Sequence, residues 1–279
     1  MLRASRVAES PESRPADHKF AVIRRAARVW AVAAIHGDAG RLRAIHDGIA
    51  PRLLPGDRLV YLGNYLGRGC AIIATLDELL RFRREFIARP KMFASDVVHL
   101  RGSQEEMWQK LLQLHFAVNP REVLDWMLGQ GVEATLLAYG GDPLRARGAM
   151  REGAMAIGRW TASVRQAIAA HPGHRELMSA LRRAAYTDDA GLLFVHAGLD
   201  PRRVLAEQGD ALWWGHAAWQ RLKGPYADYR CVVRGYGGSA AAPDPGPHAL
   251  TLDAGCGAGG PLVAACLIPD GSVVERLEA

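Results

Sequence analysis

Residues 59–69 read LVYLGNYLGRG, an apolar run that ends in glycine and asparagine and continues into a glycine-rich loop. Continuous apolar runs of this length are typical of strands buried on both faces of a sheet. The same arrangement, a short apolar run followed by small and polar residues, recurs at 30–37, 97–103, 192–198 and 231–237.

Helices are predicted in several of the gaps between these runs. Residues 76–87 place Leu, Phe and Ile side chains on one helical face, and residues 108–112 do the same. Residues 120–184 are predicted to be mainly helical. The tail is predicted to form strands at 249–253, 261–268 and 272–277, separated by turns. The alternation of strands and helices predicts an α/β fold.

Composition excludes several classes of protein. The chain has 279 residues, 49% of them apolar and 23% charged, which is ordinary for a globular protein with a large core. Glycine and proline, at 30 and 15 residues, are too few for a low-complexity or fibrous chain. The formal net charge of +6 comes mainly from arginine, which suits a phosphorylated partner as well as a solvated basic surface. Nucleic-acid binding is supported only by this positive charge and is the less favoured hypothesis.

The sequence contains neither a recognisable secretory signal nor a membrane-spanning run. Residues 1–27 are polar and arginine-rich without an apolar segment, and are predicted to be a flexible basic leader that precedes a single domain at 28–279. No apolar run approaches the roughly 20 residues that span a bilayer, so no membrane association is expected. The four cysteines do not form a disulfide scaffold. A cytoplasmic location is therefore expected.

Polar residues stand where the predicted strands end. In an open α/β sheet, ligands bind outside the carboxyl ends of the strands. One crevice lined by these residues is the functional hypothesis, and separate turns that use glycine and asparagine for their geometry are the alternative. The five strand-end residues are His36, Asn64, Ser103, His196 and Arg234.

The order of these segments resembles the calcineurin-like metallophosphoesterases, in particular the bacterial serine/threonine phosphatase and diadenosine tetraphosphatase branch. That family carries G-D-x-H-G, G-D-x-x-D-R-G, R-G-N-H-E, H-A-G or H-G-G, and a late H-G-H. The resemblance implies a four-layer sandwich of two mixed sheets flanked by helices, with residues 120–184 as a helical insertion or cap over the site. The corresponding segments here read AAIHG (33–37), GNYLGRG (63–69), RGSQE (101–105), HAG (196–198) and RGY (234–236).

Family members hold two divalent metals that support an in-line attack on a phosphoester. The resemblance implies that most of the metal ligands are replaced in this chain. Alanine cannot ligate a metal, asparagine lacks the charge of a bridging carboxylate, and arginine repels a cation. The six ligand positions read Ala34, His36, Asn64, Ser103, His196 and Arg234.

The proton-handling positions are replaced as well. The histidine of R-G-N-H-E reads Gln104, which has no pKa useful to a general acid. Its aspartate partner in G-D-x-x-D-R-G reads Gly67, and the second histidine of H-G-H reads Tyr236. The resemblance therefore implies a pseudoenzyme in which metal-hydroxide catalysis is impaired.

The arginines that hold phosphate in the family remain. Arg68 and Arg101 match them, and Arg234 is predicted to add a third guanidinium to the pocket. Such a pocket suits an anion without metal, so a phosphorylated small molecule or phosphoprotein is the expected partner. A residual site for one weakly bound Mn, Zn, Ni or Fe ion remains open, with His36, Asn64 and His196 as its candidate ligands.

Two further functions remain open at this stage. One is an active phosphoester hydrolase with a non-standard metal site. The other is an interaction scaffold with a vestigial pocket, whose partner contacts the Trp213–Trp219 face, although aromatic stripes are more often core. Asp38 is predicted to cap a helix rather than to ligate a metal, and Glu105 and Glu106 are predicted to begin another helix.

Overall fold

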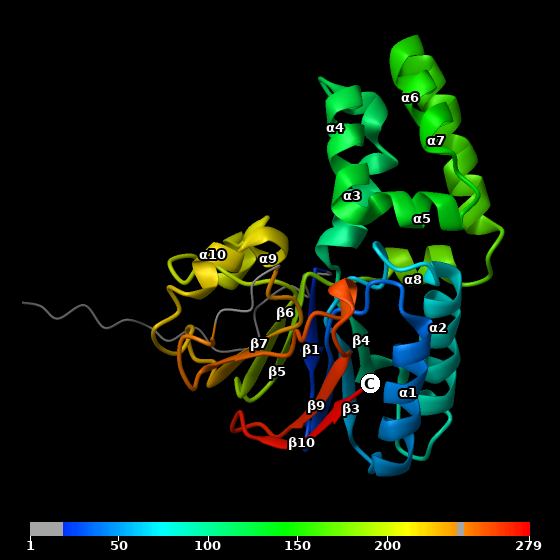
Figure 1. The fold of residues 1–279 in the computed structure, drawn as a ribbon. Helices are drawn as coiled ribbons and strands as arrows, with labels where there is room; N and C mark the ends of the chain where they lie inside the picture. Colours follow the sequence, from blue (N-terminus) through cyan, green and yellow to red (C-terminus); the bar gives the residue numbers. More distant parts are fainter. Residues whose placement is uncertain (1–18, 239–242) are drawn as a thin grey trace, which may run out of the picture.

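A computed structural model describes residues 19–238 and 243–279, and within these residues the strands form two mixed five-stranded sheets (Figure 1). The first sheet has the order β1-β5-β6-β7-β8 and the second β10-β9-β2-β3-β4. The strands of the first sheet are β1 (Phe20–Ile23), β5 (Ala184–Thr187), β6 (Leu192–Val195), β7 (Cys231–Arg234) and β8 (Ala249–Thr251). Those of the second are β2 (Val29–Val32), β3 (Arg58–Tyr61), β4 (Val97–His99), β9 (Val263–Leu267) and β10 (Val273–Glu278).

Parallel pairing places the functional loops together. Strands β2, β3 and β4 are parallel neighbours, and so are β6, β7 and β8. Parallel neighbours have their carboxyl ends at one edge of the sheet, so the polar residues that follow each strand emerge side by side. The antiparallel strands β9 and β10 complete the second sheet on its other side.

Helices cover the outer faces of the sheets, and a helical arm formed by residues 120–169 projects from one end of the sandwich (Figure 1). Helices α1 and α2 lie along the second sheet, and α9 and α10 lie on the side of the first. The α-helices are α1 (Ala39–Ile49), α2 (Ile72–Ile87), α3 (Ser103–Leu111), α4 (Pro120–Met127), α5 (Glu133–Ala138), α6 (Pro143–Glu152), α7 (Ala154–Ala169), α8 (His174–Ser179), α9 (Ala211–Trp214) and α10 (His216–Trp219), with a π-helical turn η5 (Leu128–Val132) between α4 and α5. Short 3-10 helices are η2 (Ala50–Arg52), η3 (Ala94–Asp96), η4 (Leu114–Phe116), η6 (Leu205–Glu207) and η7 (Cys256–Ala258).

Successive side chains of a strand contribute to two different hydrophobic cores, one on each face of the sheet. Leu192 and Phe194 of β6 belong to the large core that also holds the buried second sheet. Leu193 and Val195 belong to a smaller core with Trp219 of α10. Because successive side chains of a strand point to opposite faces, one apolar run supplies both cores. This explains why the sequence shows an unbroken apolar run rather than alternation.

Most of the predicted fold is confirmed. The predicted helix at 76–87 is α2, residues 120–179 contain five α-helices of the described chain, and the three tail strands are β8, β9 and β10. The predicted leader is wrong at its end, because Phe20–Ile23 forms the edge strand β1, paired in parallel with β5. Residues 1–18 of the predicted leader lie outside the described residues.

No helix in the described part of the chain is long and apolar enough to cross a bilayer. The cytoplasmic location stays a prediction.

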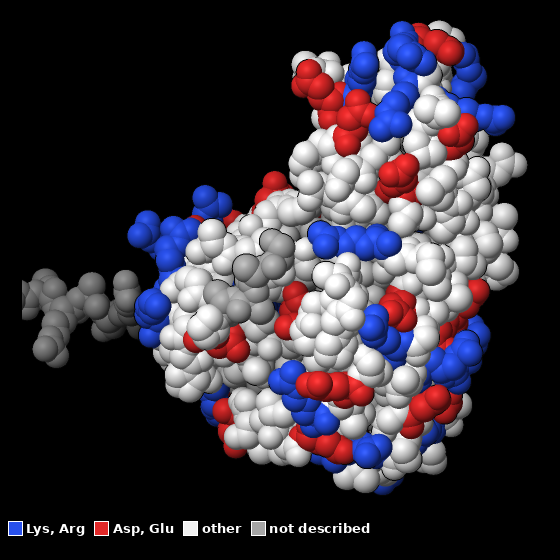
Figure 2. All heavy atoms as spheres, in the orientation of Figure 1, with Lys and Arg blue, Asp and Glu red and all other residues white. Residues whose placement is uncertain are grey.

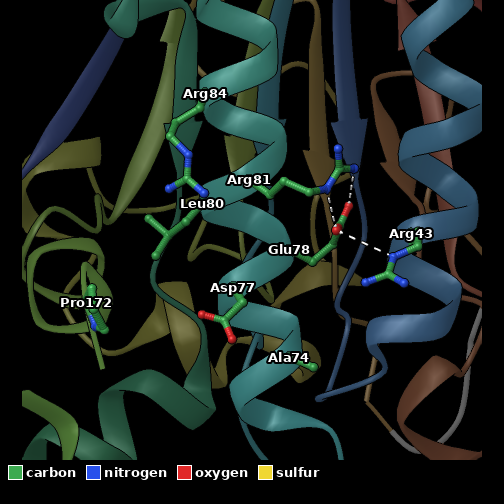
Figure 3. Close-up of a pocket in the computed structure, with 8 residues that line it drawn as sticks. All are labelled: Arg43, Ala74, Asp77, Glu78, Leu80, Arg81, Arg84 and Pro172. Carbon is green, nitrogen blue, oxygen red and sulfur yellow. Dashed lines mark hydrogen bonds and ion pairs between the residues drawn. The ribbon is translucent and has the colours of Figure 1, made fainter. Parts of the chain in front are cut away.

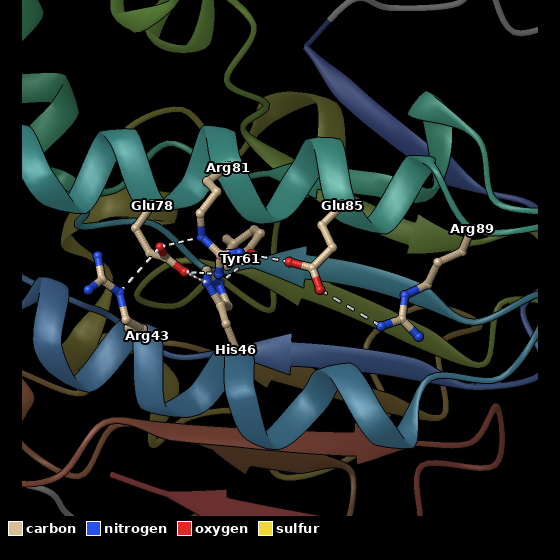
Figure 4. A network of polar contacts seen from close by, with 7 residues as sticks. All are labelled: Arg43, His46, Tyr61, Glu78, Arg81, Glu85 and Arg89. Atoms are coloured by element: carbon tan, nitrogen blue, oxygen red, sulfur yellow. Dashed lines mark hydrogen bonds and ion pairs between the residues drawn. The ribbon is translucent and has the colours of Figure 1, made fainter.

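A buried polar network fixes α1 and α2 on β3 (Figure 4). The Tyr61 hydroxyl lies 2.8 Å from Nε2 of His46, whose Nδ1 lies 2.6 Å from the carboxylate of Glu78. Arg81 donates to both oxygens of that carboxylate, at 2.7 and 2.8 Å. Hydrogen bonds to Arg81 and His46 outweigh burial and lower the pKa of Glu78 to about 2, so the carboxylate is ionised in the core.

Another buried histidine makes stability depend on pH. His99 stacks on Tyr61 with ring centroids 4.8 Å apart, and burial lowers its pKa to about 3. Below pH 6.5 the unfolded chain therefore binds a proton at His99 that the folded chain does not, and stability falls as the pH falls towards 3.

The His99→Phe variant keeps an aromatic ring on Tyr61 and removes this titration. We expect its free energy of unfolding to fall less than that of the parent between pH 7.5 and pH 5, by about 2 kcal/mol. Urea unfolding followed by circular dichroism at the two pH values measures the difference, and the pH 7.5 pair controls for packing. An equal loss in both proteins would contradict the assignment.

Candidate functional site

The loops after five strands meet at one place, as the crevice hypothesis predicts. The backbone N–H groups of Ile35 and His36 both donate to the carbonyl of Asn64, at 3.1 and 2.6 Å. Across the two sheets, the N–H of Ala34 donates to the carbonyl of Gly235 at 3.0 Å. The N–H groups of Gly235 and Tyr236 donate in turn to the carbonyl of His196, at 3.0 and 2.9 Å. The strand ends therefore form one centre rather than separate turns.

Three side chains around this centre stand on strained backbone. His36, Asn64 and Arg68 have φ of 54°, 55° and 60°, in the left-handed region that non-glycine residues rarely adopt. Each such residue costs of the order of 1 kcal/mol and persists only where surrounding structure enforces it. This strain motivates the functional hypothesis for the centre.

His36 is buried, and its lone pair is occupied. The Oδ1 atom of Asn64 accepts from the hydroxyl of Ser103 at 3.2 Å and from the N–H of Gln104 at 2.9 Å, so its Nδ2 is the donor to Nε2 of His36 at 3.3 Å. The proton of the neutral His36 ring is therefore on Nδ1, which has no hydrogen-bond partner among the described residues. Burial, with the nearby charge of Arg68, lowers the pKa of His36 to about 3.

The hydrogen-bond pattern of His196 is the reverse of that of His36. Its Nδ1–H donates to the carbonyl of Leu62 at 2.7 Å, which leaves a lone pair on Nε2. This Nε2 is buried, and residues 19–238 and 243–279 supply no hydrogen bond to it. Burial lowers the pKa of His196 to about 3, so both histidines are neutral at pH 7.

Tyr236 fills the space between these histidines. Its ring stacks on His196 with centroids 5.4 Å apart and meets His36 edge-on at 5.3 Å. A third histidine, His216, meets the same ring edge-on at 5.2 Å. In the segment R-G-Y (234–236), Tyr236 is therefore the residue whose side chain lies at the centre.

The prediction that Arg234 lines this centre is wrong. Its guanidinium lies over the ring of Trp219 at 4.4 Å, and its Nε donates to the hydroxyl of Thr251 at 2.8 Å. Arg234 and Val232 are two residues apart on β7, so both face the smaller core on the outer side of the sheet. Burial lowers the pKa of Arg234 to about 10, against the raising effects of Asp244 and Asp253, and the group stays charged at pH 7.

Gly67 and Gln104, which the resemblance aligns with proton-handling residues, are in contact. A Cβ at Gly67, where φ is 77°, would overlap the side-chain amide of Gln104. An aspartate at residue 67 is therefore incompatible with the present conformation of Gln104. Gly67 and the side chain of Gln104 are therefore linked sterically, a relation that their separation along the chain does not show.

The two remaining arginines differ. The Arg68 side chain is exposed and forms no ion pair within the described chain. Its charge adds to the burial that lowers the pKa of His36 and opposes the burial that raises the pKa of Tyr236. Arg101 instead forms an ion pair with Glu106 at 3.2 Å. Figure 2 shows positive side chains at the waist between the helical arm and the sandwich, on a face that is otherwise largely uncharged there. Arg68 is the arginine of the three that is available to an anion at this centre.

Glu105 is a structural residue of the site. Its buried carboxylate accepts the N–H groups of Asn64, Leu66 and Gly102, at 2.8, 3.0 and 2.8 Å. Burial raises its pKa, and these donors oppose the rise. It lies in the first turn of α3, as predicted, but the predicted role was an interaction with the helix dipole, whereas in the structure Glu105 joins two loops. Its place in R-G-N-H-E was the available signal.

Other predictions on single residues have mixed outcomes. Asp38 caps α1 by accepting the N–H of Arg41 at 3.0 Å, as predicted. The Trp213–Trp219 face is largely core, because Trp213 and Trp219 are 2% and 0% exposed. Trp214 is partly exposed and contacts Trp126 of the helical arm, with centroids 6.2 Å apart. The predicted partner surface is thus reduced to Trp214 and its neighbours.

The donors at the centre do not fit a pair of divalent cations. Ala34 offers a methyl group, Asn64 has its oxygen committed to two donors, and Nε2 of His36 accepts from Asn64. Among these groups, only the lone pair on Nε2 of His196 is free to bind a metal. Within the described residues, no group of three His, Cys, Asp or Glu side chains is arranged to hold a metal ion.

Two surface pockets of about 480 and 460 Å³ lie away from this centre, and no residue of the five motif loops lines either. The larger lies against α2, with Arg43 of α1 and Pro172 at its sides (Figure 3). The carboxylate of Glu78 in its wall is held by Arg81 and lies 3.7 Å from Arg43, so it is already engaged by these two arginines. The two pockets therefore give no support to a different active site.

Solved structures of two phosphatases superpose on most of this chain. A diadenosine tetraphosphatase structure, so described provisionally, superposes with a TM-score of 0.52 at 17% identity, over 94% of this chain and 98% of that one. A serine/threonine phosphatase from Saccharomyces cerevisiae with similarity to human phosphatase PP5 superposes with a TM-score of 0.54 at 13% identity, over 94% and 84%. The fold is that of the calcineurin-like metallophosphoesterases. No protein-family profile and no curated protein matches the sequence.

The metallophosphoesterase fold makes metal content the first test. After dialysis against Mn²⁺ or Zn²⁺, we expect no stoichiometric metal by mass spectrometry, because one free lone pair does not hold such an ion. In the Tyr236→His variant, a further imidazole replaces the tyrosine ring beside His36, His196 and His216, and we expect Zn²⁺ affinity to rise by more than about tenfold. Two tightly bound ions in the parent protein would contradict the proposed loss of the metal site.

Arg234 has a structural role that can be separated from the site. Replacing Arg234 with Met removes its hydrogen bond to Thr251 and its contact with Trp219, and we expect a loss of about 2–4 kcal/mol in the free energy of unfolding. Urea denaturation measures this loss. Phosphate binding by the folded variant, followed by calorimetry, should match that of the parent, and a selective loss of binding would return Arg234 to the site.

Proposed function

We propose that this protein is a pseudophosphatase, which uses the metallophosphoesterase fold to bind a phosphoryl group without metal and without turnover. The observation that carries the proposal is the Tyr236 ring, packed between His36 and His196 where the loops converge. The tyrosine ring contacts both imidazoles and offers no nitrogen ligand to a cation. The absence of a carboxylate at Ala34 and Asn64 supports the same conclusion.

Arg68 and Tyr236 supply the proposed contacts to phosphate. Neither the guanidinium of Arg68 nor the hydroxyl of Tyr236 forms a hydrogen bond within the described residues, and the charge of Arg68 acts on both Tyr236 and His36. The Nδ1–H of His36 is an additional buried donor without a partner in that part of the chain. These are N–H and O–H donors of the kind that bind phosphoryl oxygens.

Neutral histidines favour binding over catalysis. With pKa values of about 3, His36 and His196 are not protonated at pH 7, and so neither can donate the proton that a leaving alkoxide needs. Gln104 has no titratable proton either. The partner is proposed to be a phosphorylated small molecule or phosphoprotein, since the centre recognises the phosphoryl group itself.

Calorimetric titration of the metal-free protein with inorganic phosphate and with a phosphoserine peptide tests the proposal. We expect Arg68→Ala to weaken binding by about 10- to 100-fold, as for loss of a charge-assisted contact. Arg151→Ala removes the same charge from an exposed site at the end of α6 and should leave binding unchanged. Absence of binding by the parent protein would reject the proposal.

A phosphomonoesterase assay in Mn²⁺ distinguishes the other functions. Turnover that is lost in His196→Ala would establish an active hydrolase with a non-standard metal site. If there is neither turnover nor phosphate binding, the centre is vestigial, and the scaffold hypothesis, with contacts around Trp214, takes precedence.

A further inference from the structure

The helical arm is joined to the site at a π-helical turn. Nε2 of Gln104 donates to the carbonyl of Gln130 at 2.8 Å, and the N–H of Arg68 donates to the carbonyl of Gly131 at 3.2 Å. A third hydrogen bond runs from the N–H of Gly67 to the hydroxyl of Thr135 at 3.0 Å. The turn η5 and helix α5 are thus bonded to the loop that carries Arg68.

The Gln104 side chain is enclosed in this junction. It is 3% exposed and lies over Gly67, where only a residue without Cβ leaves it room. Gln130 lies beside Gly131 in the turn, so the bond from Gln104 fixes the peptide next to the one that accepts from Arg68. Removal of the amide would leave the carbonyl of Gln130 without this donor and loosen the turn.

The turn itself limits the position of Arg68. Gly131 has a φ of 104°, and a Cβ there would lie 2.8 Å from Cγ of Arg68. The stem of the arginine therefore packs directly on the backbone of η5. Gly131 is a non-helical residue within η5, so the chain kinks at the point where it contacts Arg68.

We propose that Gln104 is a positioning residue, which holds the π-helical turn against the stem of Arg68 and so orients the guanidinium towards a phosphoryl group. This inference rests on the proposed function. A former general-acid position has in this view become the anchor of the helical arm. The arm and the anion site are coupled through it, although Gln104 does not touch the anion.

The test is a double-mutant cycle measured as phosphate affinity of the full chain by calorimetry. Gln104→Leu keeps the size of the side chain and removes its donor, and we expect about fivefold weaker binding in the parent background. In an Arg68→Lys background, whose flexible ammonium does not depend on an oriented fork, we expect Gln104→Leu to have little further effect. A general structural defect would lower affinity by the same factor in both backgrounds.

The outcomes separate the two proposals. Unchanged affinity in both Arg68→Lys and Arg68→Ala rejects the anion site itself. A large effect of Arg68 together with no effect of Gln104→Leu, or with equal effects in both backgrounds, overturns the positioning role alone. If Gln104→Leu does not fold, Thr135→Val breaks the neighbouring bond from Gly67. The same cycle with Thr135→Val then decides, with the same background-dependent loss expected.

Discussion

The site depends on one buried carboxylate. Glu105 accepts three backbone N–H groups, two from the loop after β3 and one from the loop after β4, and so fixes these loops against each other. Backbone donors in a core need partners, and a buried carboxylate needs donors, so each group satisfies the other. His36, Asn64 and Arg68 hold left-handed backbone conformations around this anchor. The geometry of the centre is thus kept by a residue that lies outside any catalytic scheme.

Around this carboxylate, the side chains at the centre fit one another. Gly67 gives room to Gln104, and Gln104 reaches the helical arm. Asn64 serves as acceptor to Ser103 and Gln104 and as donor to His36. Tyr236 fills the space among three imidazoles. The centre is therefore a hydrogen-bonded and aromatic cluster, in which burial lowers the pKa values of the three histidines His36, His196 and His216.

The sequence predicted the fold better than it predicted the site. Apolar runs that end in small and polar residues were sufficient to locate the strands that carry the motif loops, and the periodicity of 76–87 located α2. Strand β1 was missed because its four residues follow a polar segment and stand alone. Among the site residues, convergence of the loops was predicted correctly, whereas the partners of Arg101 and Arg234 were not, because those partners lie on other elements of the chain.

The sequence by itself determined which residue types follow each strand, and hence that carboxylates are missing from the positions of Ala34 and Asn64. The tertiary structure alone decided that Tyr236 lies at the centre while Arg234 packs on Trp219. The direction of a side chain at a strand end depends on where the pleat stops and which face the neighbouring helix covers, and both are set by packing between sheets. Contacts between distant residues, such as Gln104 with Gln130, likewise exist only after the arm has folded onto the sandwich.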